Sequence, residues 1–431
     1  GLGDVYKRQL LYMLSGMVDT LMLSSVNDQA VGAVGTANTY IGIFIIMFSV
    51  ISSGMVAVMT QNIGAGRPGV AYQARQLGLA FNAVLGIIMS LFLSLGAGTI
   101  LSGVGVADAL MQPAKTYLQI VGGFCILNAL IPICSSYLRA FGFSKEPLYA
   151  SIIGNVINFC LNAFFLFVLH KGVAGVATAT VISRIINLVI VVLLGAVLVK
   201  AKQHPERESN RAVMGQIIRI GLPSACETAI YNVSMTLVIR FLNQMDAQGL
   251  NVTARSYTMQ ITNFSYCVGA ALAQANAIMT GWHIGAKEYD ACDRGTKKAA
   301  VIGVIVAVIL ETVFTLCSGW IMQLFSKDPQ MVSLVGKLLA IDIVLEIGRV
   351  TNLVYGQALK TSGDAVFPVV MGACFMILCS VGGTYLFGIR LGLLAVGAYI
   401  GMTGDECVRA VGMYLRWKSG KWKEKGLVKS R

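Results

Sequence analysis

Long apolar runs separated by short polar segments follow one another along nearly the whole chain. Several runs reach the roughly 20 residues that an α-helix needs to cross the hydrocarbon core of a bilayer. They are rich in Leu, Ile, Val, Gly and Ala without strict alternation, so they predict helices rather than barrel strands. From Leu10 onward the predicted spans are residues 10–25, 35–61, 76–104, 117–140, 147–169, 173–199, 216–242, 253–281, 298–325, 331–359, 365–388 and 391–415.

The composition supports a membrane protein. Of the 431 residues, 56% are hydrophobic and only 12% are charged, whereas a soluble protein carries about 25% charged residues. The mean hydropathy is +0.73. The ten Cys lie mostly inside apolar runs without a CxxC pair, and the three His are far apart, so neither residue type predicts a metal site.

The basic residues indicate orientation rather than nucleic-acid binding. The net charge is +13, but Lys and Arg lie between the apolar runs and at the C-terminus. If the N-terminus is cytoplasmic, the inside loops and the basic tail carry most of them, and the opposite loops carry fewer, Arg255 among these. We therefore expect a multi-pass protein of the cell (cytoplasmic) membrane with both termini cytoplasmic, the lipid bilayer as a partner and no nucleic-acid partner.

An internal repeat divides the chain. LRAFGFSKEP at Leu138 to Pro147 returns as LKTSGDAVFP at Leu359 to Pro368, a displacement of 221 positions. The IGA triplets that begin at Ile63 and Ile284 share the same displacement. Six predicted spans separate the copies, and such parallel repeats are typical of two-lobed secondary transporters. We interpret the basic residues of the first motif pair, Arg139 and Lys360, as topology anchors.

The repeat and the polar segments predict the domain organisation. We expect twelve transmembrane helices in two pseudo-symmetric six-helix lobes around a central cavity, in an all-α integral membrane fold. The opening residues GLGDVYKRQ are polar and leave the first helix short, so we interpret them as a non-native leader before a truncated first helix. The expected segments are leader 1–9, first lobe 10–199, cytoplasmic linker 200–215, second lobe 216–416 and basic cytoplasmic tail 417–431.

Motifs for chemistry on nucleotides or peptides are missing from the sequence. IGAGRPG at Ile63 to Gly69 lacks the GK[ST] ending of a phosphate-binding loop, and no HExxH occurs. The sequence therefore predicts a protein that is not an enzyme and has no cofactor besides a coupling ion.

Four polar residues in the first half are candidates for a cation site. Asp19 is the only carboxylate of its span, and ionisable groups inside a membrane default to functional hypotheses. Asn158 and Asn162 are four residues apart on one helix face, and Thr180 adds a hydroxyl from the next span. Amides can complete the oxygen shell of a cation at Asp19. The alternatives are a salt bridge or interfacial site for Asp19, and hydrogen bonds or helix packing for the others.

A second set of residues, in the second half, are candidates for the substrate cavity or for a polar site of the second lobe. Glu227 and Tyr231 are four apart after Pro223, and Glu346 and Arg349 are three apart. The alternative interpretation of the last two is a mutual ion pair that holds helices together. The span 253–281 is unusually polar, which fits a helix facing a water-filled cavity; its candidates are Gln260 and Asn263.

The chain resembles the multidrug and toxic compound extrusion (MATE) family of secondary transporters, of the NorM-like or DinF-like bacterial type. The resemblance covers nearly everything after Leu10. It depends on motifs that are weak singly and specific in this order: VDT at 18–20, QNIGAG at 61–66, LRAFGFSKEP, the NVINFCLN run, GVATATVIS at 175–183, GLPS at 221–224 and LKTSGD at 359–364.

The resemblance implies export of amphipathic, often cationic compounds in exchange for Na⁺ or H⁺ by rocking-type alternating access; we expect a monomer. Asp19 matches the family's first-helix carboxylate that binds the coupling cation, and Asn158 and Asn162 match its fifth-helix polar pair, so Na⁺ could bind these three. Thr180 fits the sixth-helix hydroxyl. Tyr231 and Arg349 stand where many relatives have acids, which favours the first lobe for the cation site.

Two other functions remain open. A lipid-linked saccharide flippase of a related two-lobed class would need a strongly charged cavity for pyrophosphate, whereas we expect few intramembrane Arg or Lys here. A membrane receptor or scaffold without transport is the alternative from a different class.

Overall fold

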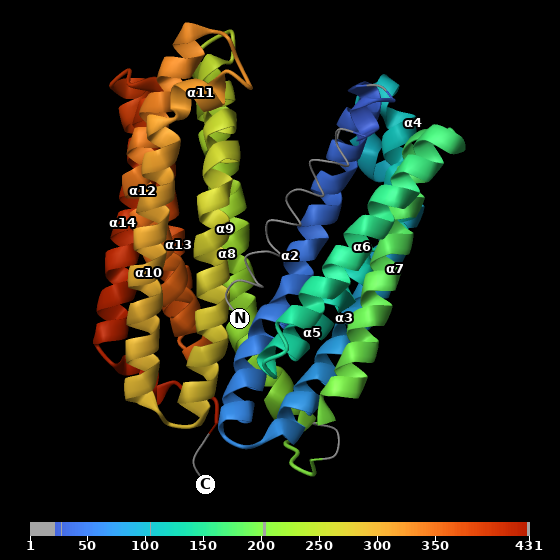
Figure 1. The fold of residues 1–431 in the computed structure, drawn as a ribbon, viewed down its shortest axis with the longest axis vertical. Helices are drawn as coiled ribbons and strands as arrows, with labels where there is room; N and C mark the ends of the chain where they lie inside the picture. Colours follow the sequence, from blue (N-terminus) through green and yellow to red (C-terminus); the bar gives the residue numbers. More distant parts are fainter. Residues whose placement is uncertain (1–21, 27, 104, 201–203, 429–431) are drawn as a thin grey trace. The chain divides into compact units, whose positions relative to one another are not determined.

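The chain folds into long helices with short connections. A computed structural model describes residues 22–26, 28–103, 105–200 and 204–428, and this described part contains no strand. The chain divides into two compact units, of which the first ends at Gly221 and the second begins at Leu222. Helices of the first unit are blue to green in Figure 1: α2 (Asp28–Gly64), α3 (Pro68–Gly103), α4 (Asp108–Tyr117), η1 (Leu118–Gly122), α5 (Ile126–Ala140), α6 (Lys145–Ala163), η2 (Phe164–Val168) and α7 (Gly172–Leu198).

The second unit contains the remaining helices, and α8 crosses the division between the units. In Figure 1 its long helices run from yellow-green at α8 to red at α14. In chain order they are α8 (Asn210–Met245), α9 (Leu250–Gly285), α10 (Tyr289–Leu316), α11 (Ser318–Met322), α12 (Pro329–Ser362), α13 (Val366–Phe375), η4 (Met376–Val381), η5 (Thr384–Arg390), α14 (Leu394–Lys418) and η6 (Lys421–Glu424).

Apolar length identifies the clearest membrane spans. Among the described residues, six helices are long and apolar enough to cross a bilayer, and a seventh forms if the pair 108–122 and 126–140, bent by 44°, counts as one span. Each predicted run from 35–61 onward lies mainly on described helix, and residue 104, the end of one run, lies outside the described residues. Most of the run 10–25 and the whole interpreted leader 1–9 lie outside the described residues. The six helices that are long and apolar enough to cross a bilayer are Gln29–Gly64, Pro68–Gly103, Lys145–Val168, Gly172–Leu198, Tyr289–Leu316 and Val366–Arg390.

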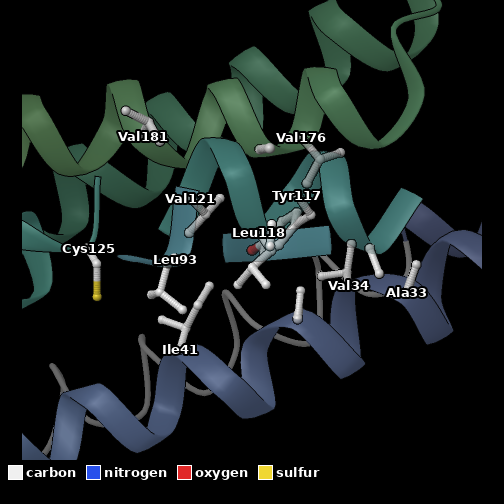
Figure 2. Packing of buried hydrophobic residues seen from close by; sticks show 14 of the residues in the cluster. Ala33, Val34, Ile41, Leu93, Tyr117, Leu118, Val121, Cys125, Val176 and Val181 are labelled. Atoms are coloured by element: carbon white, nitrogen blue, oxygen red, sulfur yellow. The ribbon is translucent and has the colours of Figure 1, made fainter. Parts of the chain in front are cut away.

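The core of the first unit is built from buried, mostly aliphatic side chains of α2, α3, α4, η1, α5, η2 and α7. Figure 2 shows Ile41 of α2, Leu93 of α3, Leu118 of η1 and Val176 of α7 gathered in one cluster. Leu93 and Leu118 are completely buried, whereas Leu95, two residues along α3, is 83% exposed. Apolar residues thus cover both the inward and the outward face of α3, as expected for a helix that contacts lipid.

Small residues bring the helices of the second unit close together around α12. Val350 of α12 packs where Gly269 of α9 and Gly303 of α10 have no side chain: a Cβ there would lie 2.9 Å and 2.7 Å from its methyl groups. On α12 itself, a Cβ at Gly348 would lie 2.8 Å from the backbone nitrogen of Cys407 in α14. These contacts place α12 in the middle of the unit and determine which polar side chains meet.

Candidate functional site

A chain of polar side chains joins α6 and α7 in the first unit. Asn162 Nδ2 donates to Asn158 Oδ1 at 2.8 Å, and Asn158 Nδ2 donates to Ser183 Oγ at 3.3 Å. Ser183 Oγ donates to the carbonyl oxygen of Thr180, whose own hydroxyl donates to the carbonyl oxygen of Val176. All four polar residues are buried. The structure therefore brings the predicted Asn158, Asn162 and Thr180 together, while Asp19 lies outside the described residues.

The second unit contains a partly open cavity of about 470 Å³. Four of the predicted residues line it: Glu227 and Tyr231 from α8, Asn263 from α9 and Arg349 from α12. Gln260 is exposed and is not among the lining residues. The rest of the wall mixes Met and Tyr side chains with charged groups, so the cavity offers both apolar and charged contacts to a ligand.

Glu346 and Arg349 form an ion pair, which was the alternative interpretation of the two residues. Glu346 is completely buried. Arg349 also lies beside α14, because its Nε is 3.7 Å from Glu406 Oε1. On the other Glu406 oxygen, Asn352 donates from 3.1 Å. The glycine at 348 allows this network, because α12 reaches the α14 backbone at Glu406 and Cys407 directly.

A second arginine lies on α14 itself. Arg409 is 3% exposed and holds Asp405 with two hydrogen bonds, from Nε at 2.7 Å and from Nη2 at 3.0 Å. Its Nη2 is also 3.2 Å from Glu406 Oε1. Ser380 of η4 completes the Asp405 site by donating at 3.0 Å. A buried guanidinium needs such partners, because an unpaired charge in this environment is costly.

Two basic residues are placed differently from the sequence-based expectation. Lys360, interpreted as a topology anchor, lines the cavity and its Nζ lies 2.5 Å from Glu227 Oε2. Arg255, counted among the loop charges, is 6% exposed and also lines the cavity. Both side chains are therefore part of the cavity wall and not exposed in a loop. Four basic residues line the cavity, together with four acidic ones: Arg255, Arg349, Lys360 and Arg409, with Glu227, Asp342, Asp405 and Glu406.

Several of these polar residues are missing from the sequence-based candidates. Asp342, Asp405 and Arg409 lie in predicted spans, as does the buried Glu311 of α10. The cost of an ionisable group inside a membrane, which selected Asp19 and Glu346, applies equally to them. That signal was available in the sequence, but only the folded helices show that the groups converge.

Comparison with known proteins identifies the family. The MatE family model matches residues 7–164 and matches again at residues 223–386. The chain is 34% identical over 424 residues to the uncharacterized transporter YisQ of Bacillus subtilis (strain 168), covering 97% of this chain and 93% of that protein. It is 22% identical over 442 residues to the probable multidrug resistance protein NorM of Thermotoga maritima, covering 97% and 91%.

The fold agrees with solved structures. The chain superimposes on a crystal structure of MATE in the straight conformation with a TM-score of 0.89, at 18% identity and with 98% and 95% of the two chains covered. The all-helical membrane fold and the family match exclude the enzyme classes considered above. The chain belongs to the MATE family of multi-pass membrane transporters.

Proposed function

We propose that this protein is a secondary antiporter that exports amphipathic or cationic compounds, such as drugs or toxic metabolites, in exchange for Na⁺ or H⁺. The observation that carries the proposal is the cavity of the second unit, whose wall contains Met and Tyr side chains together with carboxylates. Its volume of about 470 Å³ falls in the range of about 300 to 1,000 Å³ that small-molecule sites occupy.

The wall chemistry fits a substrate with an apolar body and a charged group. Met235, Met259 and Met402 offer flexible, polarizable surface, and Tyr231 and Tyr399 offer aromatic faces, all of which accommodate varied shapes. Such contacts do not require one defined ligand. Asp342, which also lines the cavity, would attract the cationic end.

The coupling cation would bind in the first unit. We assign it to Asp19 with the oxygens of Asn158, Asn162 and Thr180, of which the last three already lie in one buried polar chain. Cation entry would change the packing of this unit, open the transporter outward and release substrate. One inward charge supplies about 2.3 kcal/mol per 100 mV, which sustains roughly a fifty-fold gradient of a neutral substrate.

The membrane arrangement belongs to the same proposal. The helices from α2 to α14, together with the apolar run at 10–25, make twelve transmembrane helices in two six-helix lobes. Both termini face the cytoplasm of a cell whose cytoplasmic membrane holds the protein as a monomer, and the lobes rock between inward-open and outward-open states. A flippase for an anionic pyrophosphate headgroup fits the cavity less well, because Arg349, Lys360 and Arg409 already pair with carboxylates.

Drug accumulation in cells without their own efflux pumps tests the function. The protein should lower the accumulation of a cationic dye such as ethidium, and Asp19→Asn should abolish this effect at unchanged expression. The matched control is Glu424→Gln, an exposed carboxylate in the C-terminal 3₁₀ turn, which should export normally. Collapsing the Na⁺ and H⁺ gradients separately identifies the ion. Unchanged accumulation with the wild-type protein would contradict export, and normal export by Asp19→Asn would contradict its coupling role.

A further inference from the structure

One basic residue of the cavity wall has no acidic partner in the described part of the chain. Arg255 of α9 lines the cavity and is 6% exposed. The other basic residues of the wall each form an ion pair with a carboxylate: Arg349, Lys360 and Arg409. Among the described residues, Arg255 therefore contributes the one basic charge of this wall that the protein itself does not balance.

The guanidinium of Arg255 also makes few hydrogen bonds. Its one hydrogen bond within the described residues runs from Nη2 to the sulfur of Met235, at 3.7 Å. A thioether sulfur is only a weak acceptor, whereas an arginine has five N–H donors. Nε of Arg255 is buried and has no partner among the described residues. Because buried donors without acceptors are unfavourable, the geometry calls for an acceptor from outside the chain.

Packing keeps Arg255 away from lipid headgroups. An arginine near the end of a membrane helix usually extends its charged group to the membrane surface. On α9 the adjacent Ala254 and, one turn further, Thr258 are completely buried, so this face of the helix is turned into the second unit. Since Arg255 lines the cavity, the acceptor that it lacks has to come from there.

An acidic group lies on the same stretch of the cavity wall. Tyr399 of α14 lines the cavity and is close enough to both Arg255 and Asp342 to interact electrostatically with each. Arg255 and Asp342 form no ion pair with each other in the described structure, so the two opposite charges stay separate beside one aromatic side chain. A ligand with an anionic group, a cationic group and an apolar body would satisfy all three.

We propose that Arg255 is an anion subsite of this cavity and binds a carboxylate group of an amphipathic substrate. A guanidinium donates two parallel hydrogen bonds to a carboxylate, and the pair is strengthened where water is excluded. One guanidinium matches one carboxylate, whereas a pyrophosphate would need several unpaired basic groups. The inference rests on the proposed function, because it takes the cavity as the substrate site.

The subsite determines which amphipathic compounds the cavity retains. A compound that is only cationic leaves the guanidinium without an acceptor and is repelled by it. A compound that also carries a carboxylate supplies the missing acceptor. A site built to hydrogen-bond a group discriminates strongly against an analogue that lacks the group. The cavity should therefore distinguish an acid from its ester, which differ in this charge but little in shape.

A matched pair of dyes tests this distinction. Rhodamine B carries a xanthylium cation and a carboxylate, and its ethyl ester keeps the cation but lacks the carboxylate. Fluorescence polarisation with the purified full chain in detergent measures the affinity for each dye. Arg255→Gln should weaken the binding of rhodamine B by roughly tenfold or more, and should leave the ester bound at least as tightly as before. Arg255→Lys, which keeps the charge, should retain most of the affinity for rhodamine B.

Arg240→Gln is the matched control. Arg240 is exposed on α8 and does not line the cavity, so this variant should bind both dyes as the wild-type protein does. Thermal unfolding separates ligand binding from a structural role. An arginine that holds a buried carboxylate lowers the midpoint when it is removed. Arg255 has no such partner among the described residues, so Arg255→Gln should unfold at the wild-type midpoint or above.

Three results would overturn the subsite. Equal weakening of both dyes by Arg255→Gln would mean that Arg255 shapes the cavity without recognising the carboxylate. Unchanged binding of both dyes would leave water as the partner of the guanidinium. Wild-type protein that does not bind rhodamine B would show that the cavity rejects the carboxylate.

A measurement on the wild-type protein alone covers the case in which Arg255→Gln does not fold. Excess benzoate should displace rhodamine B, whereas benzamide, which has the same shape and no charge, should not; equal displacement by the two overturns the subsite. These assays need no ion gradient and no transport. Failure of export with an intact acid–ester difference would count against the proposed function alone, and normal export without that difference against the subsite alone.

Discussion

Lys360 Nζ lies 2.5 Å from Glu227 Oε2 and joins α12 to α8 at the wall of the cavity. Both side chains are largely buried, with 13% and 15% of their surfaces exposed. The lysine therefore occupies the carboxylate that a cationic substrate would otherwise approach, and it acts as an internal competitor for that position.

Removing the lysine should strengthen the binding of cations. In Lys360→Met, Glu227 loses its partner, and a cationic ligand can replace it; we expect roughly tenfold tighter binding of ethidium, equivalent to about 1.4 kcal/mol. A neutral dye of similar size should bind as before. Lys337→Met, an exposed lysine on the same helix, is the control. Fluorescence titration of purified protein measures both, and unchanged ethidium affinity in Lys360→Met would exclude competition.

The glycine at 348 should be required for the packing of α12 on α14. A Cβ at this position would lie 2.8 Å from Cys407 N and 2.9 Å from the Glu406 carbonyl carbon. Because both are backbone atoms, the helices must separate, and Gly348→Ala should destabilise the protein by about 1 to 3 kcal/mol.

The control for this substitution is Gly404→Ala on α14. A Cβ there meets no atom within 4 Å, so the substitution should be neutral or stabilising by up to about 1 kcal/mol. Thermal unfolding in detergent compares the two variants. Equal midpoints would show that the helices tolerate a side chain at the crossing.

Arg409 should matter far more to stability than its neighbour Arg416. Arg409→Met leaves Asp405 as an uncompensated buried charge, and breaking a buried pair in this way costs about 3 to 5 kcal/mol. Arg416 bonds Asp364 at the same 2.7 Å but is itself 20% exposed, so water can reach the 5% exposed Asp364 when the arginine is removed, and Arg416→Met should cost less, about 1 to 2 kcal/mol. Unfolding midpoints measure both, and similar losses in the two variants would contradict the burial argument.

The turn between α8 and α9 should make stability depend on pH. Slight burial alone would raise the pKa of Asp246. Hydrogen bonds from Asn251, Leu250 and Gly249 outweigh this effect and lower the pKa below its usual value. Its two oxygens accept from Leu250 N at 2.8 Å and from Asn251 Nδ2 at 2.6 Å. A lowered pKa means that the folded state binds the proton less readily than the unfolded state.

The stabilisation is therefore complete above the ordinary pKa of an aspartate and is lost as the pH falls through the lower, folded-state value. Asp246→Asn should remove this part of the acid dependence and should lower the midpoint at neutral pH. Midpoints measured from pH 7 down to pH 3 for both proteins test this. An acid profile that is the same with and without the carboxylate would contradict the assignment.

The sequence predicts the helices well because lipid contact imposes the apolar pattern directly. It also predicts that Asn158 and Asn162 share a helix face, which requires only helical spacing, and it offers the ion pair of Glu346 with Arg349 as an alternative for those two residues. It does not predict that Lys360 reaches Glu227, because Lys360 follows an apolar run and has the sequence context of a loop charge. Contacts between helices depend on where backbones can touch.

The convergence of three carboxylates between α10 and α12 shows the same limit. Glu311 meets Asp342 and Glu346 because Val350 fits against Gly303, and a glycine in a membrane helix does not reveal its partner in the sequence. Glu406 meets Arg349 because Gly348, which has no side chain, lets α12 approach the backbone of α14 at Glu406 and Cys407. The residue types were visible as unusual charges in apolar runs, but their grouping follows from helix crossings between segments that are far apart in the chain.

Because α14 is made late, the crossing of α12 and α14 at Gly348 cannot form until synthesis is nearly complete. Arg349 leaves the ribosome well before Glu406, since α14 is the last of the long helices to be made. Until α14 inserts, Arg349 has Glu346 but lacks the partner that α14 supplies, and the lipid cannot replace it. A nascent transporter that stalls before α14, or loses it, therefore carries Arg349 without its Glu406 partner. Membrane quality control can recognise such an incomplete network of buried charges.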